Sequence, residues 1–228
     1  MTSVAMVRPV EAASVVERVT AEIRQAIVTG RLAPGQEFSL RQIAAQLGVS
    51  FIPVREALRS LEAEGLLETR RGRSAIVAPL NLEELHAICQ LCRLIEPDVR
   101  VRSARLIRPA DLDRLELALD ALLDGCRTLD ESYQRSHAFH TELVRPAATA
   151  WDLRILERLW RALERYVRFG SRRADRDGSD ARFPDPAPKR ALLAAYRSGD
   201  PDAVREATLR NIDAQERIGG RGLEHVRP

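Results

Sequence analysis

Two short amphipathic helices meet at a glycine corner in the stretch "SLRQIAAQLGVSFIPVREALRSLEAE", residues 39–64. Ser39 is placed to cap the first helix, and Gly48 is placed to end it. Ser50 is placed to cap the second helix, and Pro53 falls in its first turn, where a missing N–H group costs little. The buried stripe of the first helix is expected to contain Leu40, Ile43, Ala44 and Leu47. This pattern predicts a helix-turn-helix over about residues 40–59.

The segments on either side extend the helix-turn-helix into a larger unit. An amphipathic helix is predicted over residues 14–29, and a turn and a short extended segment connect it to residue 39. After the second helix, strands are predicted at 66–69 and 75–78, around the turn Arg71-Gly72-Arg73. Residues 12–79 are therefore expected to form a winged helix-turn-helix of three helices and a β-wing, after a flexible N-terminus at 1–11.

The second helix of the motif is expected to present one face outward. Val54, Leu58 and Leu61 are spaced to face the core. The opposite side is expected to carry Phe51, Arg55, Arg59 and Glu62. Two arginines four residues apart repel each other mildly unless an anion lies across them, which favours a DNA-recognition face. The alternative is a solvated face, with Arg59 paired to Glu56 or Glu62. That alternative explains the arginines at the tip of the neighbouring wing only as a coincidence.

Composition limits the function classes without identifying one. The chain has 36 basic and 33 acidic residues, so its net charge of +3 does not by itself indicate a nucleic-acid partner. Only Lys189 is a lysine, so nearly all of its cationic chemistry is guanidinium, which suits phosphate and guanine. No apolar run reaches the roughly 18 residues of a membrane span, and the N-terminus lacks a signal-peptide pattern. Three cysteines do not form a disulfide framework, and we expect a cytoplasmic protein.

After residue 79 the pattern becomes entirely helical. The expected fold is therefore mainly α, with an all-α helical bundle following the winged helix. The stretch at 171–188 lacks periodicity and is rich in charges, glycine and proline, which predicts a mobile loop, and 219–228 is expected to be a tail. Helices are predicted at 82–107, 111–126, 131–144, 151–169, 189–197 and 201–218.

Residues 12–79 resemble the winged-helix domain of the GntR superfamily in the turn "GRLAPG", the corner "GVS" and the run "PVREAL". The resemblance implies that Arg41, Arg55, Ser50 and the wing around Gly72 contact DNA. Many relatives carry arginine and threonine where this chain has Phe51 and Ile52, so an apolar contact with a thymine methyl, or packing in the groove, replaces readout by guanidinium. The full set of candidate DNA-binding residues is Arg41, Ser50, Phe51, Ile52, Pro53, Arg55, Arg59, Arg70, Arg71, Gly72 and Arg73.

Residues 82–218 resemble the helical ligand-binding domain of the FadR subfamily, called FCD, in "LIEPDVRVRSARL", "SHAFHTEL" and "ALLAAYRSGDPDAVREATLRN". This resemblance implies a homodimeric transcriptional regulator that binds a small-molecule effector. Two winged helices related by a two-fold axis would bind an inverted-repeat operator in double-stranded DNA. The resemblance also favours a repressor, because repression is common in this family.

Many FCD domains hold a divalent metal with one aspartate and three histidines. Aligning the motifs places Ser136, His140, Lys189 and Asn211 at those four positions, so a single ligand survives. A lysine ammonium has no lone pair and repels a cation, and we therefore expect no metal and no other cofactor. We expect these four residues to line a polar cavity in which Lys189 holds an anionic effector. The alternatives are a pocket that has lost its function and a Lys189 that points to solvent. His137 is not expected to share the site with His140 as a substitute ligand, because adjacent helix positions point about 100° apart.

Other candidate sites are weaker. Cys89 and Cys92 lie within a helix, with His86 nearby and no second cysteine pair, so we interpret them as core residues rather than as a metal or redox site. The four aromatic residues Tyr133, Trp151, Trp160 and Tyr166 are also expected in the core. No nucleotide-binding glycine motif, nucleophile elbow or metal-hydrolase histidine spacing is present, so an enzyme is the least favoured class. A nucleoid-type DNA-binding protein without an effector stays as the other alternative.

Overall fold

A computed structural model describes residues 14–70, 74–125, 128–176, 186–221 and 223 of the 228-residue chain. Its internal contacts divide the chain into two compact units, residues 1–79 and residues 80–228. Each unit has its own buried core.

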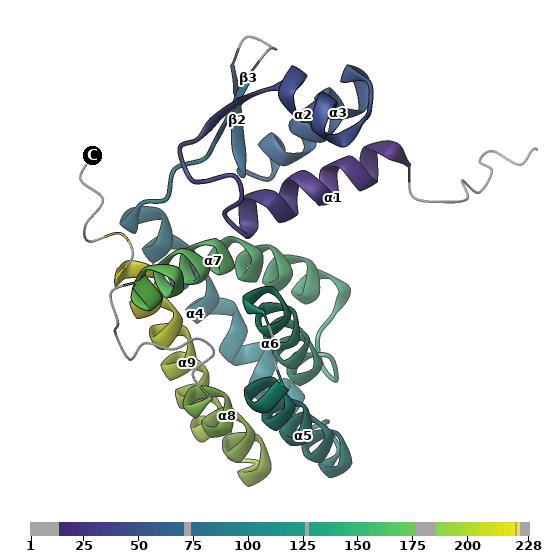
Figure 1. Cartoon of the computed structure of the whole chain (residues 1–228). Coiled ribbons are helices and arrows are strands. Elements are labelled where there is room, and N and C mark those ends of the chain that lie inside the picture. Colours follow the sequence, from purple (N-terminus) through teal and green to yellow (C-terminus); the bar gives the residue numbers. More distant parts are fainter. Residues whose placement is uncertain (1–13, 71–73, 126–127, 177–185, 222, 224–228) are drawn as a thin grey trace, which may run out of the picture. The chain divides into compact units, whose positions relative to one another are not determined.

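The first unit is a winged helix-turn-helix with a small antiparallel sheet in the order β1-β3-β2 (Figure 1). In the sheet register, Ala75 of β3 pairs with Phe38 of β1 on one side and with Thr69 of β2 on the other. The core contains Phe38 together with the apolar stripes of the three helices. The elements are α1 (Val15–Val28), β1 (Glu37–Ser39), α2 (Leu40–Leu47), α3 (Phe51–Ala63), β2 (Leu67–Arg70) and β3 (Ser74–Val77).

Local signals define most of the helix ends in this unit. Ser39 and Gln42 form a capping box at the start of α2, and Gly48 ends α2 at φ 64°, a left-handed conformation that glycine adopts at low cost. Ser50 occupies the N-cap position of α3, but its side chain accepts no capping hydrogen bond, so the expected cap by Ser50 is wrong. The Ser50 hydroxyl is exposed instead, on the surface beside α3.

The second unit is all helix. Figure 1 shows α4 beside α7 and α9, with α5 packed on α6 and α8. Apolar side chains from all six helices fill its core clusters. The helices are α4 (Leu82–Ala104), α5 (Pro109–Gly125), α6 (Leu129–Val144), α7 (Ala150–Arg176), α8 (Ala187–Ser198) and α9 (Pro201–Arg221). None of the described helices is both long enough and apolar enough to cross a membrane.

Two helices in this unit run further than the sequence pattern predicts. Helix α7 continues to Arg176, so the first six residues of the predicted loop at 171–188 are helical, and α9 continues to Arg221, three residues into the predicted tail. A Cβ atom on Gly170 would lie 1.9 Å from the Ile218 carbonyl oxygen, so the backbones of α7 and α9 approach closely there. This packing, with Ser171 buried beyond it, stabilises a polar segment that has little helical pattern of its own.

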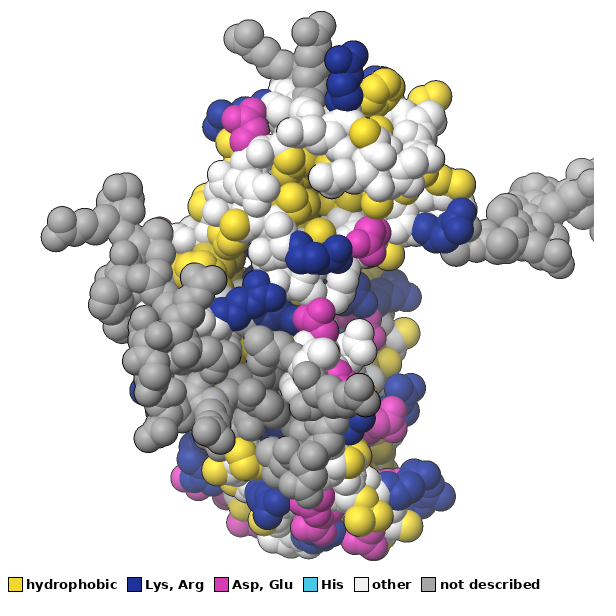
Figure 2. All heavy atoms as spheres, in the orientation of Figure 1, with side chains coloured by type: hydrophobic (Ala, Val, Ile, Leu, Met, Phe, Trp, Pro, Cys, Tyr) yellow, Lys and Arg dark blue, Asp and Glu magenta, His cyan; other side chains and the backbone are white. Residues whose placement is uncertain are grey.

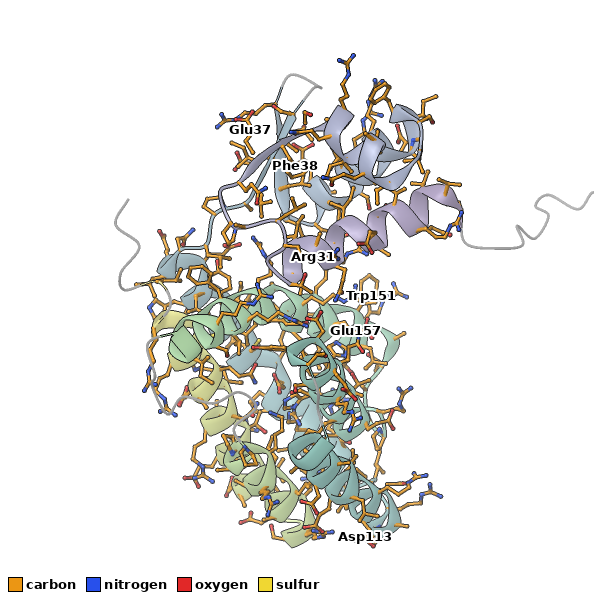
Figure 3. The ribbon with its side chains drawn as sticks, viewed as in Figure 1. Arg31, Glu37, Phe38, Asp113, Trp151 and Glu157 are labelled. Carbon is orange, nitrogen blue, oxygen red and sulfur yellow. The ribbon has the colours of Figure 1, made fainter. Side chains whose placement is uncertain are left out.

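The cysteine prediction is confirmed and the aromatic prediction is partly wrong. Cys89 and Cys92 are fully buried in the core of the helical unit. Burial raises the pKa of the Cys89 thiol to about 12 and raises that of Cys92 as well, so both stay protonated and unreactive at neutral pH. Tyr133, Trp160 and Tyr166 are buried as expected, but Trp151 is 67% exposed near the start of α7 (Figure 3).

Candidate DNA-binding face and helical-unit cavity

The outward face of α3 begins with two exposed apolar side chains. Phe51 is 47% exposed and Ile52 is 71% exposed, both in the first turn of the helix. Arg55 and Arg59 follow on the same side and are also exposed. The opposite side is buried against α1 and α2 through Val54, Ala57, Leu58 and Leu61. The predicted division of α3 into a core stripe and an outward face is confirmed.

The two arginines of this face differ in their surroundings. Arg59 forms an exposed ion pair with Glu56 at 3.1 Å, as the solvated-face alternative proposed. Arg55 makes no hydrogen bond or ion pair with any residue that the structure describes. An exposed guanidinium that is not paired with a described residue is suited to bind a phosphate or a base edge.

Glu62 connects α3 to the wing. Its carboxylate accepts hydrogen bonds from the Thr69 backbone N–H at 2.7 Å and from the Thr69 hydroxyl at 2.8 Å. The backbone hydrogen bond from Thr69 holds the pKa of Glu62 below its usual value. This contact fixes the orientation of β2 relative to the helix, and it removes Glu62 from the charges available on the outward face.

The remaining DNA-binding candidates lie around this helix. Arg41 on α2, Ser50 at the N-cap and Arg70 at the end of β2 are exposed, and Pro53 is half-buried in the first turn of α3. The wing-tip residues Arg71, Gly72 and Arg73 lie outside the described residues. On the face of the helical unit shown in Figure 2, by contrast, basic and acidic side chains are interspersed. One exposed ion pair of the helical unit joins Arg190 to Asp120 at 2.8 Å.

Three of the four residues predicted for the effector site line one cavity in the helical unit. Ser136 and His140 come from α6 and Lys189 comes from α8, and all three side chains are buried. The cavity has about 40 Å³ of free space, a few times the roughly 10–15 Å³ needed for one water molecule. Asn211 is buried on α9, one helical turn before the lining residue Gln215. The other lining residues are Tyr133, His137, Trp160, Glu164 and Val167.

His137 lies in the same cavity, which the sequence argument did not expect. Ser136 and His137 are adjacent on the helix, so their side chains point about 100° apart. His137 and His140 are three residues apart and therefore point only about 60° apart. Both imidazole rings contact Trp160, with ring centroids 5.7 Å and 6.1 Å away. Trp160 and Tyr133, which were predicted only as core residues, also contribute to the cavity wall.

A buried ion pair on α4 contacts two residues that line the cavity, Trp160 and His140. Arg100 is fully buried and donates to the Glu96 carboxylate at 2.9 Å and 2.6 Å. The second Glu96 oxygen accepts from the Trp160 indole N–H at 3.0 Å. Sequence reasoning did not assign a role to Glu96 or Arg100. The available signal was an oppositely charged pair at i and i+4 in "LIEPDVR", within a helix predicted to be packed on several sides.

Arg100 also determines which nitrogen of the His140 ring carries the proton. Its Nη2 atom lies 3.0 Å from His140 Nδ1, and because a guanidinium can only donate, Nδ1 is the acceptor and the ring proton lies on Nε2. Burial, followed by the nearby charges of Arg100 and Lys189, holds the pKa of His140 well below its ordinary value. His140 is therefore neutral at physiological pH, with one acceptor used and one N–H group to donate.

Three buried polar atoms around this region have no hydrogen-bond partner among the described residues: Arg100 Nη1, His137 Nε2 and Asn211 Nδ2. Two of them can only donate. A buried polar group without a partner costs roughly 1–3 kcal/mol, so a ligand or water that accepts these hydrogen bonds would be stabilising.

The donor set does not fit a transition metal. Ser136 offers a weak hydroxyl ligand, Lys189 carries a positive charge, and the acceptor nitrogen of His140 is already engaged by Arg100. In the part of the chain that the structure describes, no group of three or more histidine, cysteine, aspartate or glutamate side chains could hold a metal ion.

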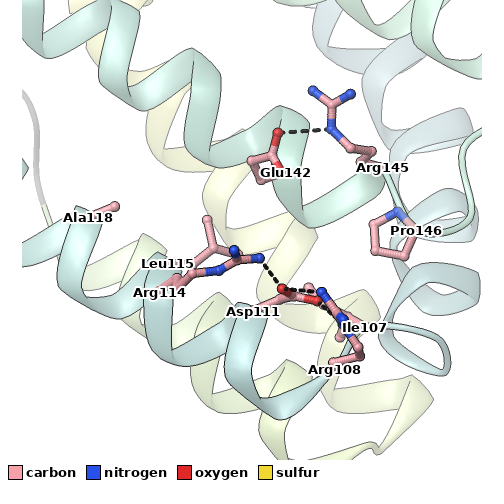
Figure 4. A pocket seen from close by; sticks show the side chains of 9 residues that line it. All are labelled: Ile107, Arg108, Asp111, Arg114, Leu115, Ala118, Glu142, Arg145 and Pro146. Atoms are coloured by element: carbon pink, nitrogen blue, oxygen red, sulfur yellow. Dashed lines mark hydrogen bonds and ion pairs between the residues drawn. The ribbon is translucent and has the colours of Figure 1, made fainter.

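A second, shallower pocket lies where α5 begins and α6 ends (Figure 4). It has about 490 Å³ of free space and presents three arginines. Arg108 and Arg114 both pair with Asp111, and Arg145 pairs with Glu142 at 2.8 Å. Each of the three arginines is already engaged by a carboxylate, two of them by Asp111, and the pocket is open at the surface, so we consider it a weaker candidate for an anion site than the buried cavity.

A winged helix-turn-helix with an exposed recognition helix, followed by a helical unit with its own polar cavity, defines a two-domain transcriptional regulator. The chain belongs to the GntR family. The profile of bacterial regulatory proteins of the gntR family matches residues 15–77, and the profile of the FCD domain matches residues 87–214. The sequence prediction of a GntR-type DNA-binding domain followed by an FCD domain is thus confirmed, and this is a family of bacterial transcriptional regulators.

Curated relatives agree with this assignment. The chain is 28% identical over 165 residues to the HTH-type transcriptional regulator BphR of Paraburkholderia xenovorans, covering 68% of this chain and 66% of that protein. It is 27% identical to the transcriptional repressor RspR of Escherichia coli, covering 83% and 82%. It is 24% identical to the galactonate operon transcriptional repressor of Escherichia coli, covering 88% and 95%. In the first four curated relatives the match spans 46–66% of the relative's own length.

Solved structures share the fold. McbR/YncC of Escherichia coli superposes with a TM-score of 0.68 at 21% identity, covering 90% of this chain and 99% of that one. A GntR-type regulator from Rhodococcus gives a TM-score of 0.68 at 24% identity, covering 91% and 99%.

Proposed function

We propose that this protein is a homodimeric repressor that binds an inverted-repeat operator and responds to a small anionic metabolite held in the helical-unit cavity. The effector part of this proposal rests on one observation. Ser136, His140 and Lys189 line the same cavity, close to buried polar atoms that have no hydrogen-bond partner among the described residues. The family assignment supports the DNA-binding part.

The DNA-binding part depends on Arg55. It is exposed on the outward face of α3, and no described residue neutralises it. In a two-fold symmetric dimer each α3 would enter a major groove and read one half-site, while Arg41 and the arginines of the wing would contact phosphates.

The anionic character of the proposed effector follows from the donors. The His140 Nε2–H group, the Lys189 ammonium, the Ser136 hydroxyl and the Asn211 amide all donate hydrogen bonds, and a carboxylate or phosphate accepts without donating. Among the described residues of the cavity wall, the one carboxylate, Glu164, is engaged by Arg168 at 2.7 Å, and Asp130 shares that guanidinium. Two relatives are named as repressors of the gluconate and galactonate operons, and both of those compounds are carboxylates.

The effector proposal can be tested with Lys189→Met. Thermal-shift measurements against a panel of small carboxylates and phosphate esters should find a stabilising compound for the wild type, and that compound should alter operator binding. In Lys189→Met the compound should lose both effects while operator affinity stays unchanged. Arg190→Met is the matched control, because Arg190 is the next cation on α8 but is exposed and paired with Asp120. An unchanged response in Lys189→Met would remove Lys189 from the site.

The DNA-binding proposal can be tested with Arg55→Ala, measured by fluorescence anisotropy on the upstream region of the protein's own gene. Loss of a base or phosphate contact should weaken binding by about 1–3 kcal/mol per half-site. Arg59→Ala should have a smaller effect, because Arg59 is already paired with Glu56. Equal affinities for wild type and Arg55→Ala would overturn the role of Arg55. Binding of random duplex as tightly as any selected sequence would instead favour the nucleoid-type alternative.

A further inference from the structure

The first turn of α3 presents an apolar surface where its base-reading contacts are expected. Phe51 and Ile52 are 47% and 71% exposed, although both residue types are usually buried. At about 100° per residue, Phe51, Arg55, Arg59 and Ile52 fall within an arc of about 100° on the side opposite the core stripe. The two apolar side chains are therefore part of the outward face, where they form the two edges of this arc with Arg55 and Arg59 between them.

The charges of α3 leave little capacity for hydrogen-bonded base recognition. Arg59 is paired with Glu56 and Glu62 is bonded to Thr69, so Arg55 is the guanidinium of this helix that no described residue engages. One such arginine reads one guanine through its O6 and N7 acceptors. Besides Arg55 and the exposed Ser50 at the N-cap, this end of α3 offers base selection through the apolar side chains of Phe51 and Ile52.

From this surface we infer that Phe51 and Ile52 select thymine through its C5 methyl group, next to the base that Arg55 contacts in each half-site. The inference rests on the proposed DNA-binding function and names the base chemistry that this face recognises.

The physical reason is the cost of desolvation. The thymine methyl is the apolar group that an unmodified base pair presents in the major groove, whereas guanine and adenine present acceptors and donors. An apolar side chain pressed against those polar groups would remove their water without replacing its hydrogen bonds, which is unfavourable. Against a methyl group the same contact buries apolar surface on both sides and is favourable.

Arg55 and Phe51 are one helical turn apart, about 6 Å along the helix axis, and successive base pairs rise about 3.4 Å. The thymine contacts should therefore lie within about two base-pair steps of the base that Arg55 reads. A half-site consensus with thymine beside guanine follows from this spacing.

The test changes the DNA and leaves the protein unaltered. Selection of the full-length wild-type protein on a library of random duplexes gives its consensus, and each thymine is then replaced by deoxyuridine, which lacks only the methyl group. At the thymines beside the Arg55 contact, each replacement should weaken binding about fourfold, and replacement in both half-sites about fifteenfold. Thymines elsewhere in the consensus should tolerate the change.

Variants assign the methyl effect to the two residues. Phe51→Ala/Ile52→Ala should bind the thymine and deoxyuridine duplexes equally. Leu117→Ala is the matched control, since Leu117 is 69% exposed on α5, outside the DNA-binding unit, and it should keep the full difference. Equal wild-type affinity for the two duplexes at every position would overturn the inference while leaving the DNA-binding proposal standing. A selection that returns no consensus would overturn the operator proposal and the inference with it.

Discussion

His140 shows how one buried residue can make the stability of the helical unit depend on pH. Its pKa in the folded protein lies well below its ordinary value, mainly because of burial. Above an unfolded-state pKa of about 6.5 the residue is neutral in both states and contributes no pH dependence. Below that pH the unfolded chain binds a proton that the folded chain excludes, so stability should fall by up to about 1.4 kcal/mol per pH unit.

This dependence can be measured by urea unfolding at pH 7.5, 6.5 and 5.5. Both tryptophans, Trp151 and Trp160, lie in the helical unit, so tryptophan fluorescence follows that unit specifically. His140→Gln should reduce the loss of unfolding free energy on acidification. The same pH dependence in wild type and variant would contradict the assignment.

The identities of four side chains also determine whether the cavity binds metal. Protein purified without a tag or a chelator should contain far less than one zinc, nickel or manganese ion per chain, because Lys189 repels a cation and Ser136 is a poor ligand. Elemental analysis of the wild-type protein checks this prediction. Near-stoichiometric metal in the wild type would refute the prediction.

Within the winged helix, the contact between Glu62 and Thr69 holds α3 and β2 together, the two elements proposed to contact DNA. Removing the Glu62 carboxylate leaves the Thr69 N–H and hydroxyl without their acceptor, and it should lower stability by about 1 kcal/mol. Amide hydrogen exchange at Thr69 should accelerate in Glu62→Ala. Glu56→Ala is the control, because it removes only the exposed pair with Arg59 and should leave the exchange at Thr69 unchanged. Equal exchange rates in the two variants would show that Glu62 does not hold the wing.

The sequence predicted elements well where a local signal and the tertiary packing agree. Ser39 and Gly48 determine the ends of α2 directly through capping and a left-handed turn. The end of α7 was not predictable, since "SRRADR" has no helical periodicity and is stabilised by the approach of Gly170 to α9. At Ser50 a local signal is present but is not used. The residue type suits the N-cap position, yet the side chain does not form the expected hydrogen bond.

The cavity was predictable only where a motif could be aligned. Ser136, His140 and Lys189 were found in this way, and the structure brings them together. Glu96 and Arg100 lie about 40 residues from His140 in sequence and belong to no site motif, so their roles depend on how α4 packs against α6 and α7. A buried ion pair of this kind is visible only once the helices are assembled.

For the whole molecule, the order of elements along the chain connects the cavity to the DNA-binding unit. Residues 78–81 join β3 to α4, and α4 carries Arg100, which donates to His140 in the cavity wall. A ligand that prefers one arrangement of this network shifts the population of that arrangement, and α4 is the covalent route by which the shift can reach the wing.

The strongest consequence of such coupling is reciprocity. If the effector changes operator affinity by some factor, the operator must change effector affinity by the same factor, with typical couplings of about 5–150-fold. Calorimetric titration of the effector into wild-type protein, alone and bound to its operator, should give two dissociation constants whose ratio equals the ratio of operator affinities with and without effector. In Lys189→Met both ratios should fall to about one, because the substitution lies in the cavity and not on the DNA-binding face. If the effector binds equally well in both titrations, the cavity does not regulate DNA binding, and the protein acts on DNA independently of the compound it holds.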